Sequence, residues 1–100
     1  MNMQPMLQQA QRMKRELEKA QNQLKETEFT VTKGGAVTVV VYGSKKIKSI
    51  TIDKDAFEAD NKEMIEDLIA VSINELNEQI DKAEAEINER ITGSAGGFGF

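Results

Sequence analysis

Basic side chains in the first quarter of the chain have the types and spacing needed to bind phosphate groups. On a helix, at 100° per residue, Arg12, Arg15 and Lys19 fall on one side, and Lys14 adds a fourth cation nearby. Guanidinium and ammonium groups in such a row can donate hydrogen bonds to successive phosphates. The alternative is a solvated face, because Arg12 and Lys14 each have a glutamate four residues later. Arg15 and Lys19, however, form a like-charged pair that favours a nearby anion.

A second basic group lies where the sequence predicts strands and turns. Lys33 stands beside a Gly-Gly turn, and Lys45, Lys46 and Lys48 lie around the next turn. Lysines at sheet edges also prevent unwanted strand pairing, so both roles stay open. Aromatic residues do not alternate with these cations, which disfavours stacking of single-stranded bases and favours contact with a duplex backbone. The candidate nucleic-acid-binding residues are Arg12, Lys14, Arg15, Lys19, Lys33, Lys45, Lys46 and Lys48.

Other kinds of chemistry find little support in the composition. The chain contains no cysteine and no histidine, which removes thiolate and imidazole catalysis and the common zinc sites. The acidic residues near position 55 lack the glycine and the final glutamate of a calcium loop. Gly34 and Gly35 have no phosphate-loop context. We therefore predict a binding protein with no catalytic residue, metal ion, cofactor or small-molecule substrate.

The cations of the first group belong to a predicted helix over residues 5–26. Pro5 suits the first helical turn, and the interior consists mostly of good helix formers. Apolar residues recur at intervals of 4, 3, 4, 3 and 4, a heptad pattern typical of a seam that packs on another helix. The residues of this seam are Met6, Ala10, Met13, Leu17, Ala20 and Leu24.

Residues 28–53 predict a three-stranded antiparallel meander. Apolar and polar residues alternate, and glycines mark the two turns. Val40 and Tyr42 add apolar area to the face opposite the three odd-numbered valines of the middle strand, so both faces of that strand need cover. The isoleucines of the third strand change phase, which predicts a bulge, or a strand start, near Lys48.

A second helix is predicted from about residue 60 to residue 91. A capping box, with Asp60 at the N-cap and Glu63 three positions on, opens it. At 1.5 Å per residue it spans about 45 Å, longer than so small a body is wide, so part of it must project. Its second half keeps only a thin apolar stripe and is expected to form an arm. Its first half is expected to be buried on the sheet through Met64, Ile65, Leu68, Ile69, Val71 and Ile73.

The length and composition predict one small domain, residues 1–91, followed by a mobile Gly/Phe tail, residues 92–100. With 100 residues and five aromatics its core is thin, which favours association of two copies. The expected fold is α+β, an intertwined homodimer with protruding helical arms. No stretch approaches the roughly 18 apolar residues of a membrane span, so we expect a cytoplasmic protein. The predicted dimer interface comprises Met6, Ala10, Met13, Leu17, Val40 and Tyr42.

Charge is distributed unevenly along the chain. Residues 1–54 carry ten basic and five acidic residues (+5), whereas residues 55–100 carry three and twelve (−9), which together give the net charge of −4. Within a Debye length of about 10 Å a ligand senses local charge more than the total. The basic half can therefore attract a polyanion although the whole chain is acidic.

The order of elements and several strings of residues resemble the YbaB/EbfC family of nucleoid-associated proteins over nearly the whole chain. The strings are Gln9-Ala10-Gln11-Arg12-Met13, Gly34-Gly35-Ala36-Val37-Thr38-Val39 and, most specifically, Asp60-Asn61-Lys62-Glu63-Met64-Ile65-Glu66-Asp67-Leu68-Ile69. The resemblance implies a bacterial protein of the cytoplasm and nucleoid, with no catalytic motif. It further implies a homodimer whose helical arms bind double-stranded DNA with limited sequence preference, with roles in nucleoid organisation and gene regulation.

A protein-interaction module is the alternative function. A prefoldin-like chaperone subunit also places a hairpin between two helices, and a coiled-coil adaptor would use the apolar seam of the first helix. Prefoldin helices are similar in length and pair with each other, whereas the two helices predicted here differ in length. Binding of DNA or of an unfolded client distinguishes the two hypotheses.

Overall fold

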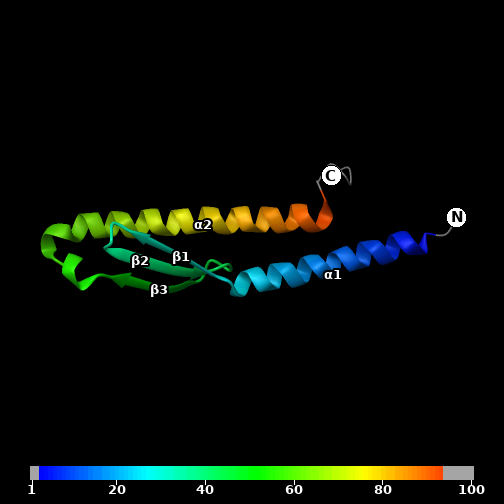
Figure 1. Cartoon of the computed structure of the whole chain (residues 1–100), viewed down its shortest axis with the longest axis horizontal. Helices are drawn as coiled ribbons and strands as arrows, with labels where there is room; N and C mark the ends of the chain where they lie inside the picture. Colours follow the sequence, from blue (N-terminus) through cyan, green and yellow to red (C-terminus); the bar gives the residue numbers. More distant parts are fainter. Residues whose placement is uncertain (1–2, 94–100) are drawn as a thin grey trace.

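The computed structural model describes residues 3–93 and shows two helices with a three-stranded sheet between them in the chain (Figure 1). The molecule is elongated, with extents of 73 × 22 × 15 Å, and this shape fits the predicted helical arms. Helix α1 runs away from one end of the sheet, and helix α2 lies along the sheet and continues beside α1. The elements in chain order are α1 (Gln4–Glu26), β1 (Glu28–Lys33), β2 (Val37–Tyr42), β3 (Ile47–Ile52) and α2 (Lys62–Thr92), with short 3-10 turns at Lys54–Ala56 and Ala59–Asn61.

Helix α1 has the bounds that the sequence predicted, apart from one additional residue at its start. Pro5 lies in the first turn, where its missing N–H group costs no helical hydrogen bond. At the other end Thr27 turns to extended backbone, and its hydroxyl donates a 2.8 Å hydrogen bond to the Gln23 carbonyl. The helix therefore ends where the chain must enter β1.

The predicted meander is confirmed as an antiparallel sheet of order β1-β2-β3. Gly34 and Gly35 both have positive φ angles, 61° and 62°, which glycine adopts without a steric penalty. The bulge is confirmed as well: Val40 pairs with Ser49 while Val41 pairs with Ile47, so Lys48 is the extra residue.

Helix α2 covers one face of the sheet over β1 and β2 (Figure 1). The valines of β2 that point to this helix are at most 1% exposed. Ile65, Leu76 and Ile80 of α2 complete the core, and the buried Ser72 satisfies its hydroxyl by donating to the Leu68 carbonyl at 2.6 Å. Burial of these apolar groups at about 25 cal/mol per Å² holds the helix on the sheet.

Two expectations for the start of α2 are wrong. Asp60 is not the N-cap, because residues 59–61 form a 3-10 turn and Asn61 takes the cap position without a side-chain cap bond. Asn61 instead donates to the Ala56 carbonyl at 2.9 Å, which fixes the preceding turn. Met64 and Val71 are not buried on the sheet but are 44% and 53% exposed, because a helix resting on two strands buries only one stripe.

Beyond the sheet, the second half of α2 packs against the first helix of its own chain. Ala20 is buried there, and Gln21 Nε2 donates to Asn88 Oδ1 of α2 at 3.5 Å. The apolar seam of α1 therefore meets the thin stripe of α2 in the same chain. The half-buried residues on the two sides of this contact are Met13, Leu17 and Leu24 of α1 and Ala83, Ile87 and Ile91 of α2.

Candidate nucleic-acid interface

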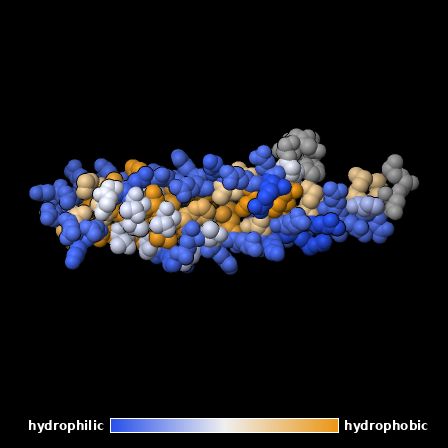
Figure 2. Space-filling model, in the orientation of Figure 1, coloured by the Kyte–Doolittle hydropathy of each residue, from blue (hydrophilic) through white to orange (hydrophobic). Residues whose placement is uncertain are grey.

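The four cations predicted on the first helix are all exposed on α1. Arg12 and Arg15 lie on the side of the helix opposite the seam that faces α2, Lys14 lies at the flank of the seam, and Lys19 borders a hollow that α1 forms with Arg90 and Ile91 of α2. On the face shown in Figure 2, hydrophilic residues cover most of the projecting part of α1, whereas apolar residues gather over the sheet and along the helix junction. The geometry thus leaves the cations on a surface that a large ligand can reach.

None of these four cations has a carboxylate within 4.0 Å in the described part of the chain. The predicted i,i+4 pairs of Arg12 with Glu16 and of Lys14 with Glu18 therefore do not form. Exposed pairs of this kind contribute only about 0.3–0.5 kcal/mol, so solvation competes with them easily. Among the described residues, no ion pair therefore holds these four cations.

Three of the four predicted sheet lysines, in contrast, are held by acidic residues. Lys45 Nζ lies 2.8 Å from Asp81 of α2, and Lys48 Nζ lies 2.6 Å from Glu28 of β1. Lys46 is exposed and has no carboxylate partner among the described residues.

Lys33 makes the most enclosed of these ion pairs. Its Nζ lies 2.6 Å from Glu75 Oε2, with both side chains about one third exposed. That oxygen is itself buried and accepts no well-aligned hydrogen bond, so the charge of Lys33 is what compensates it. Because Lys33 is held by Glu75, its ammonium group is less available to bind a phosphate.

The Lys48 ammonium shows the effect of its partner on protonation. The hydrogen bond to Glu28, and then the negative charge of Glu28, raise the pKa of Lys48 above its ordinary value of 10.5. Lys48 is therefore positively charged at neutral pH, but the negative charge of Glu28 offsets much of the attraction that Lys48 could exert on a phosphate.

The turn between β2 and β3 joins the two basic groups in space. The Gly43 amide donates to the Thr27 carbonyl at 2.8 Å, and the Ser44 amide donates to the Lys25 carbonyl at 3.3 Å. A Cβ at Gly43 would meet the Leu24 carbonyl oxygen at 1.9 Å, so only glycine permits this contact. Lys45 and Lys46 thus adjoin the end of α1, whereas Lys33 lies at the opposite end of the sheet.

Lys25 is a further cation near this surface that was not among the candidate nucleic-acid-binding residues predicted from the sequence. It is exposed in the last turn of α1, and its carbonyl receives the Ser44 amide of the β2–β3 turn. It therefore stands between the cations of α1 and Lys46. Glycine at position 43 is the residue in the sequence that allows the β2–β3 turn to approach the end of α1. The glycine alone does not show which segment the turn contacts.

The residues predicted for a dimer interface fall into three environments. Met13 and Leu17 are half-buried against α2 of the same chain, whereas Met6 and Ala10 are exposed beyond that contact. The remaining two, Val40 and Tyr42, are half-buried on the sheet face that points away from α2. Their role in a dimer stays a prediction.

Two features of the described residues bear on other functions. Between residues 3 and 93 no helix is long and apolar enough to cross a membrane. Over the same range no group of three or more carboxylates is arranged to hold a metal ion.

Comparison with known proteins gives a consistent result. The model of the YbaB/EbfC DNA-binding family matches residues 1–95. A nucleoid-associated protein of Acetivibrio thermocellus is 40% identical over 98 residues, covering 97% of this chain and 87% of the relative. One of Agathobacter rectalis is 41% identical over 97 residues (96% and 86%), and one of Chloroflexus aurantiacus is 35% identical over 99 residues (98% and 99%). The chain therefore belongs to the YbaB/EbfC family of DNA-binding, nucleoid-associated proteins.

Proposed function

We propose that this protein binds double-stranded DNA as a homodimer, with the exposed cations of α1 contacting phosphates. The observation that carries the proposal is that Arg12, Lys14, Arg15 and Lys19 lie on a projecting helix and form no ion pair with a carboxylate among residues 3–93. Phosphate contacts of this kind fix a protein on DNA but do not select a base sequence. Limited sequence preference follows from such binding, and we propose that the protein acts in nucleoid organisation and gene regulation.

The acidic residues of α2 limit the strength of the grip. Residues 55–100 carry a net charge of −9, and α2 runs beside α1 over part of its length. Repulsion between these acids and DNA weakens the complex, whereas the contacts between cations and phosphates make its affinity fall with added salt. We expect contact to be confined to the outer side of α1 and the neighbouring β2–β3 turn.

The test of this interface is a pair of charge-matched variants. Arg12→Glu with Arg15→Glu removes two phosphate contacts per chain, or four per dimer. The slope of log affinity against log salt should then become shallower by about 3.6, at about 0.9 per contact. Lys54→Glu with Lys82→Glu changes the net charge equally at exposed positions outside α1. Equal loss in both variants would contradict the proposed surface, and helicity by circular dichroism controls for folding.

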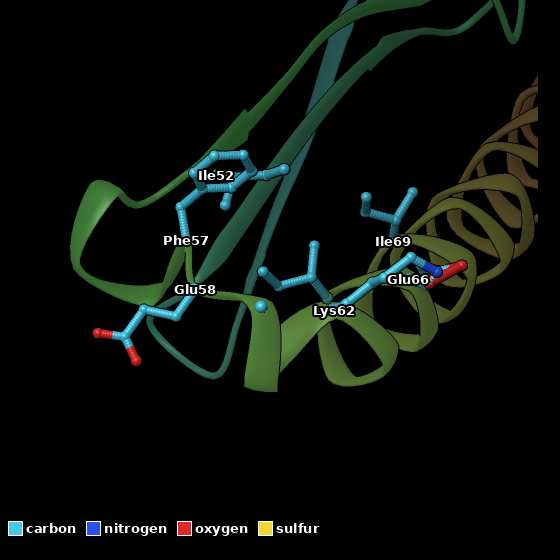
Figure 3. Close-up of a pocket in the computed structure, with 8 residues that line it drawn as sticks. Ile52, Phe57, Glu58, Lys62, Glu66 and Ile69 are labelled. Carbon is cyan, nitrogen blue, oxygen red and sulfur yellow. Dashed lines mark hydrogen bonds and ion pairs between the residues drawn. The ribbon is translucent and has the colours of Figure 1, made fainter.

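A second copy is needed because an apolar groove lies open between α2 and β3 (Figure 3). Its volume is about 570 Å³, and Ile52 and Phe57 on one side face Ile69 and the start of α2 on the other. Ile47 and Ile50 extend it along β3, where they point to the same side as the core valines yet are 45% and 42% exposed. Helix α2 leaves this strand uncovered, because it lies over β1 and β2.

The surface area supports the same conclusion. A compact monomer of 11.2 kDa exposes about 5,700 Å² by the usual scaling with mass, whereas this chain exposes 7425 Å². The excess, about 1,700 Å², is ample for the roughly 800 Å² per partner of a standard interface. In a two-fold arrangement α2 of each copy can cover β3 of the other, so that both grooves close together.

The oligomeric state tests this groove. We expect the wild-type protein to sediment as a dimer and Ile50→Asp to sediment as a monomer, because the new carboxylate would be buried in the interface. Val71→Asp places the same charge at an exposed apolar position of α2 that lies away from the groove, and it should stay dimeric. A dimeric Ile50→Asp protein would remove the groove from the interface.

A further inference from the structure

The first turns of α1 carry two neutral amides between two cations. Gln8 and Gln11 are about one turn apart and fall within about 60° of each other around the helix. Arg12 and Lys14 lie on either side of these amides and point about 160° apart. The arm therefore presents a strip of hydrogen-bonding amides with a positive charge along each edge.

Acidic residues are absent from the same stretch. None of residues 1–15 is acidic, and the first turn of α1 contains no acid. An acidic side chain there would stabilise the helix by about 0.3–1 kcal/mol through its dipole, and Glu63 occupies such a position in α2. A carboxylate on this part of the arm would also repel a phosphate backbone. The composition of these turns is thus suited to a polyanionic ligand.

The amide strip is open to a ligand in the single chain and in the proposed dimer. Gln8 and Gln11 are exposed, and neither side chain takes part in a hydrogen bond among residues 3–93. The first turns of α1 project beyond the end of α2 (Figure 1). The strip lies on the side of α1 opposite the apolar seam, so a second copy bound at Met6 and Ala10 would leave it uncovered.

The major groove of B-form DNA matches this arrangement. It is about 12 Å wide and admits a helix about 10–12 Å in diameter, whereas the minor groove, about 6 Å wide, is too narrow. With the amides toward the floor of the groove, the two cations point to its two walls, which are the phosphate rows of opposite strands. A glutamine amide pairs with adenine through the N6 and N7 atoms exposed on that floor.

We propose that the first turns of α1 lie in the major groove of DNA, with Gln8 and Gln11 hydrogen-bonded to the edges of adenines. Arg12 and Lys14 contact phosphates of opposite strands. This inference rests on the proposed DNA binding and adds the groove and the base that the arm recognises. Because only two side chains per chain read bases, the preference for adenine is modest. The later cations of α1 contact phosphates where the straight helix leaves the winding groove.

A duplex in which 7-deazaadenine replaces adenine tests the base contacts. The replacement removes the N7 acceptor from the major groove and leaves the charge and the base pairing of the duplex unaltered. We expect the wild-type protein to bind the adenine duplex about fivefold more tightly, which corresponds to about 1 kcal/mol. Gln8→Ala with Gln11→Ala should bind both duplexes equally, and its salt dependence should match that of the wild type because the amides are neutral.

Gln9→Ala with Gln23→Ala is the matched control. Both amides are exposed on other sides of α1, so this variant should keep the fivefold difference. Helicity by circular dichroism should be the same in all the proteins compared. Equal binding of the wild type to the two duplexes would overturn the base contacts, and so would a fivefold difference retained by the Gln8 and Gln11 variant.

The two flanking cations test insertion into the groove. Arg12→Gln and Lys14→Gln should each make the slope of log affinity against log salt shallower by about 1.8 for two contacts per dimer. An effect at only one of them would place α1 against a single strand and overturn the insertion, while the proposed DNA binding would stand. A wild-type protein that binds neither duplex would contradict the DNA binding and this inference together.

Discussion

The body of the molecule, which is the sheet with the part of α2 that lies on it, differs from its arm, helix α1, in how apolar and basic side chains are used. Over the sheet, Leu76 and Ile80 are fully buried and the lysines are mostly bound to acids. Along α1, apolar residues are half-buried at best over most of the helix, and none of the four candidate cations has a carboxylate within 4.0 Å among residues 3–93. The body therefore supplies most of the buried apolar surface that stabilises the fold, and the arm presents unpaired positive charge to a ligand.

Removing a core side chain gives the largest difference between the two regions. Leu76→Ala should lower the free energy of unfolding by about 2–5 kcal/mol, because it leaves a cavity at a position with no exposed area. Leu17→Ala on the half-buried arm contact should cost clearly less. Urea unfolding followed by circular dichroism measures both. Equal losses would mean that the arm stabilises the fold as much as the body does.

The joint between body and arm is the next most sensitive point. Gly43→Ala places a methyl group on the Leu24 carbonyl, so the turn or the helix must shift, at a cost of about 1–3 kcal/mol. Gly35→Ala tests backbone strain without a steric contact, since nothing lies within 4 Å of its Cβ position. Thermal unfolding of the two variants separates the causes. A smaller loss at Gly43 than at Gly35 would show that the joint yields easily.

Single neutral substitutions test whether ion pairing decides which cations bind DNA. Arg15→Gln should make the salt dependence of DNA affinity shallower by about 1.8 for two contacts per dimer. Lys48→Gln should change it little, since Glu28 already holds that ammonium. Lys46→Gln is the informative intermediate, because Lys46 shares the location of Lys48 but has no described carboxylate partner. A larger effect at Lys48 than at Arg15 would reverse the assignment of roles.

The smallest expected effect concerns the pH dependence of the Lys48–Glu28 pair. Because the folded-state pKa of Lys48 is raised above 10.5, its contribution to stability is complete below pH 10.5 and disappears as pH rises through the raised value. The stability difference between wild type and Lys48→Met should therefore be constant from pH 7 to 10 and narrow above that range. Denaturant titrations at fixed salt measure it. A difference that grows at high pH would contradict the sign.

Local patterns predicted the elements well, because each depends on residues close in sequence. The 4-3 spacing of α1 and the phase change at Lys48 both have a physical basis within a few residues, and both are confirmed. The capping box failed because Asp60 belongs to a 3-10 turn fixed by contacts around Asn61 and Ala56. The exposure of Met64 and Val71 depends on how wide a strip of sheet the helix covers, which periodicity does not specify.

The candidate interface was predictable in part. Exposed cations on one side of α1 follow from helical geometry alone, whereas the partners of Lys33 and Lys45 lie on α2, more than 35 positions later. Lys25 escaped notice because its place beside the β2–β3 turn arises from a contact between distant segments.

By itself the sequence determined the helices, the meander, the family and the row of cations, because periodicity, turn residues and charge are properties of neighbouring positions. The tertiary structure alone decided that the seam of α1 packs on α2 of the same chain, that three sheet lysines bind acids, and that β3 is left uncovered. Those outcomes depend on which distant surfaces meet, and burial and Coulomb energies are set by that meeting and not by spacing along the chain.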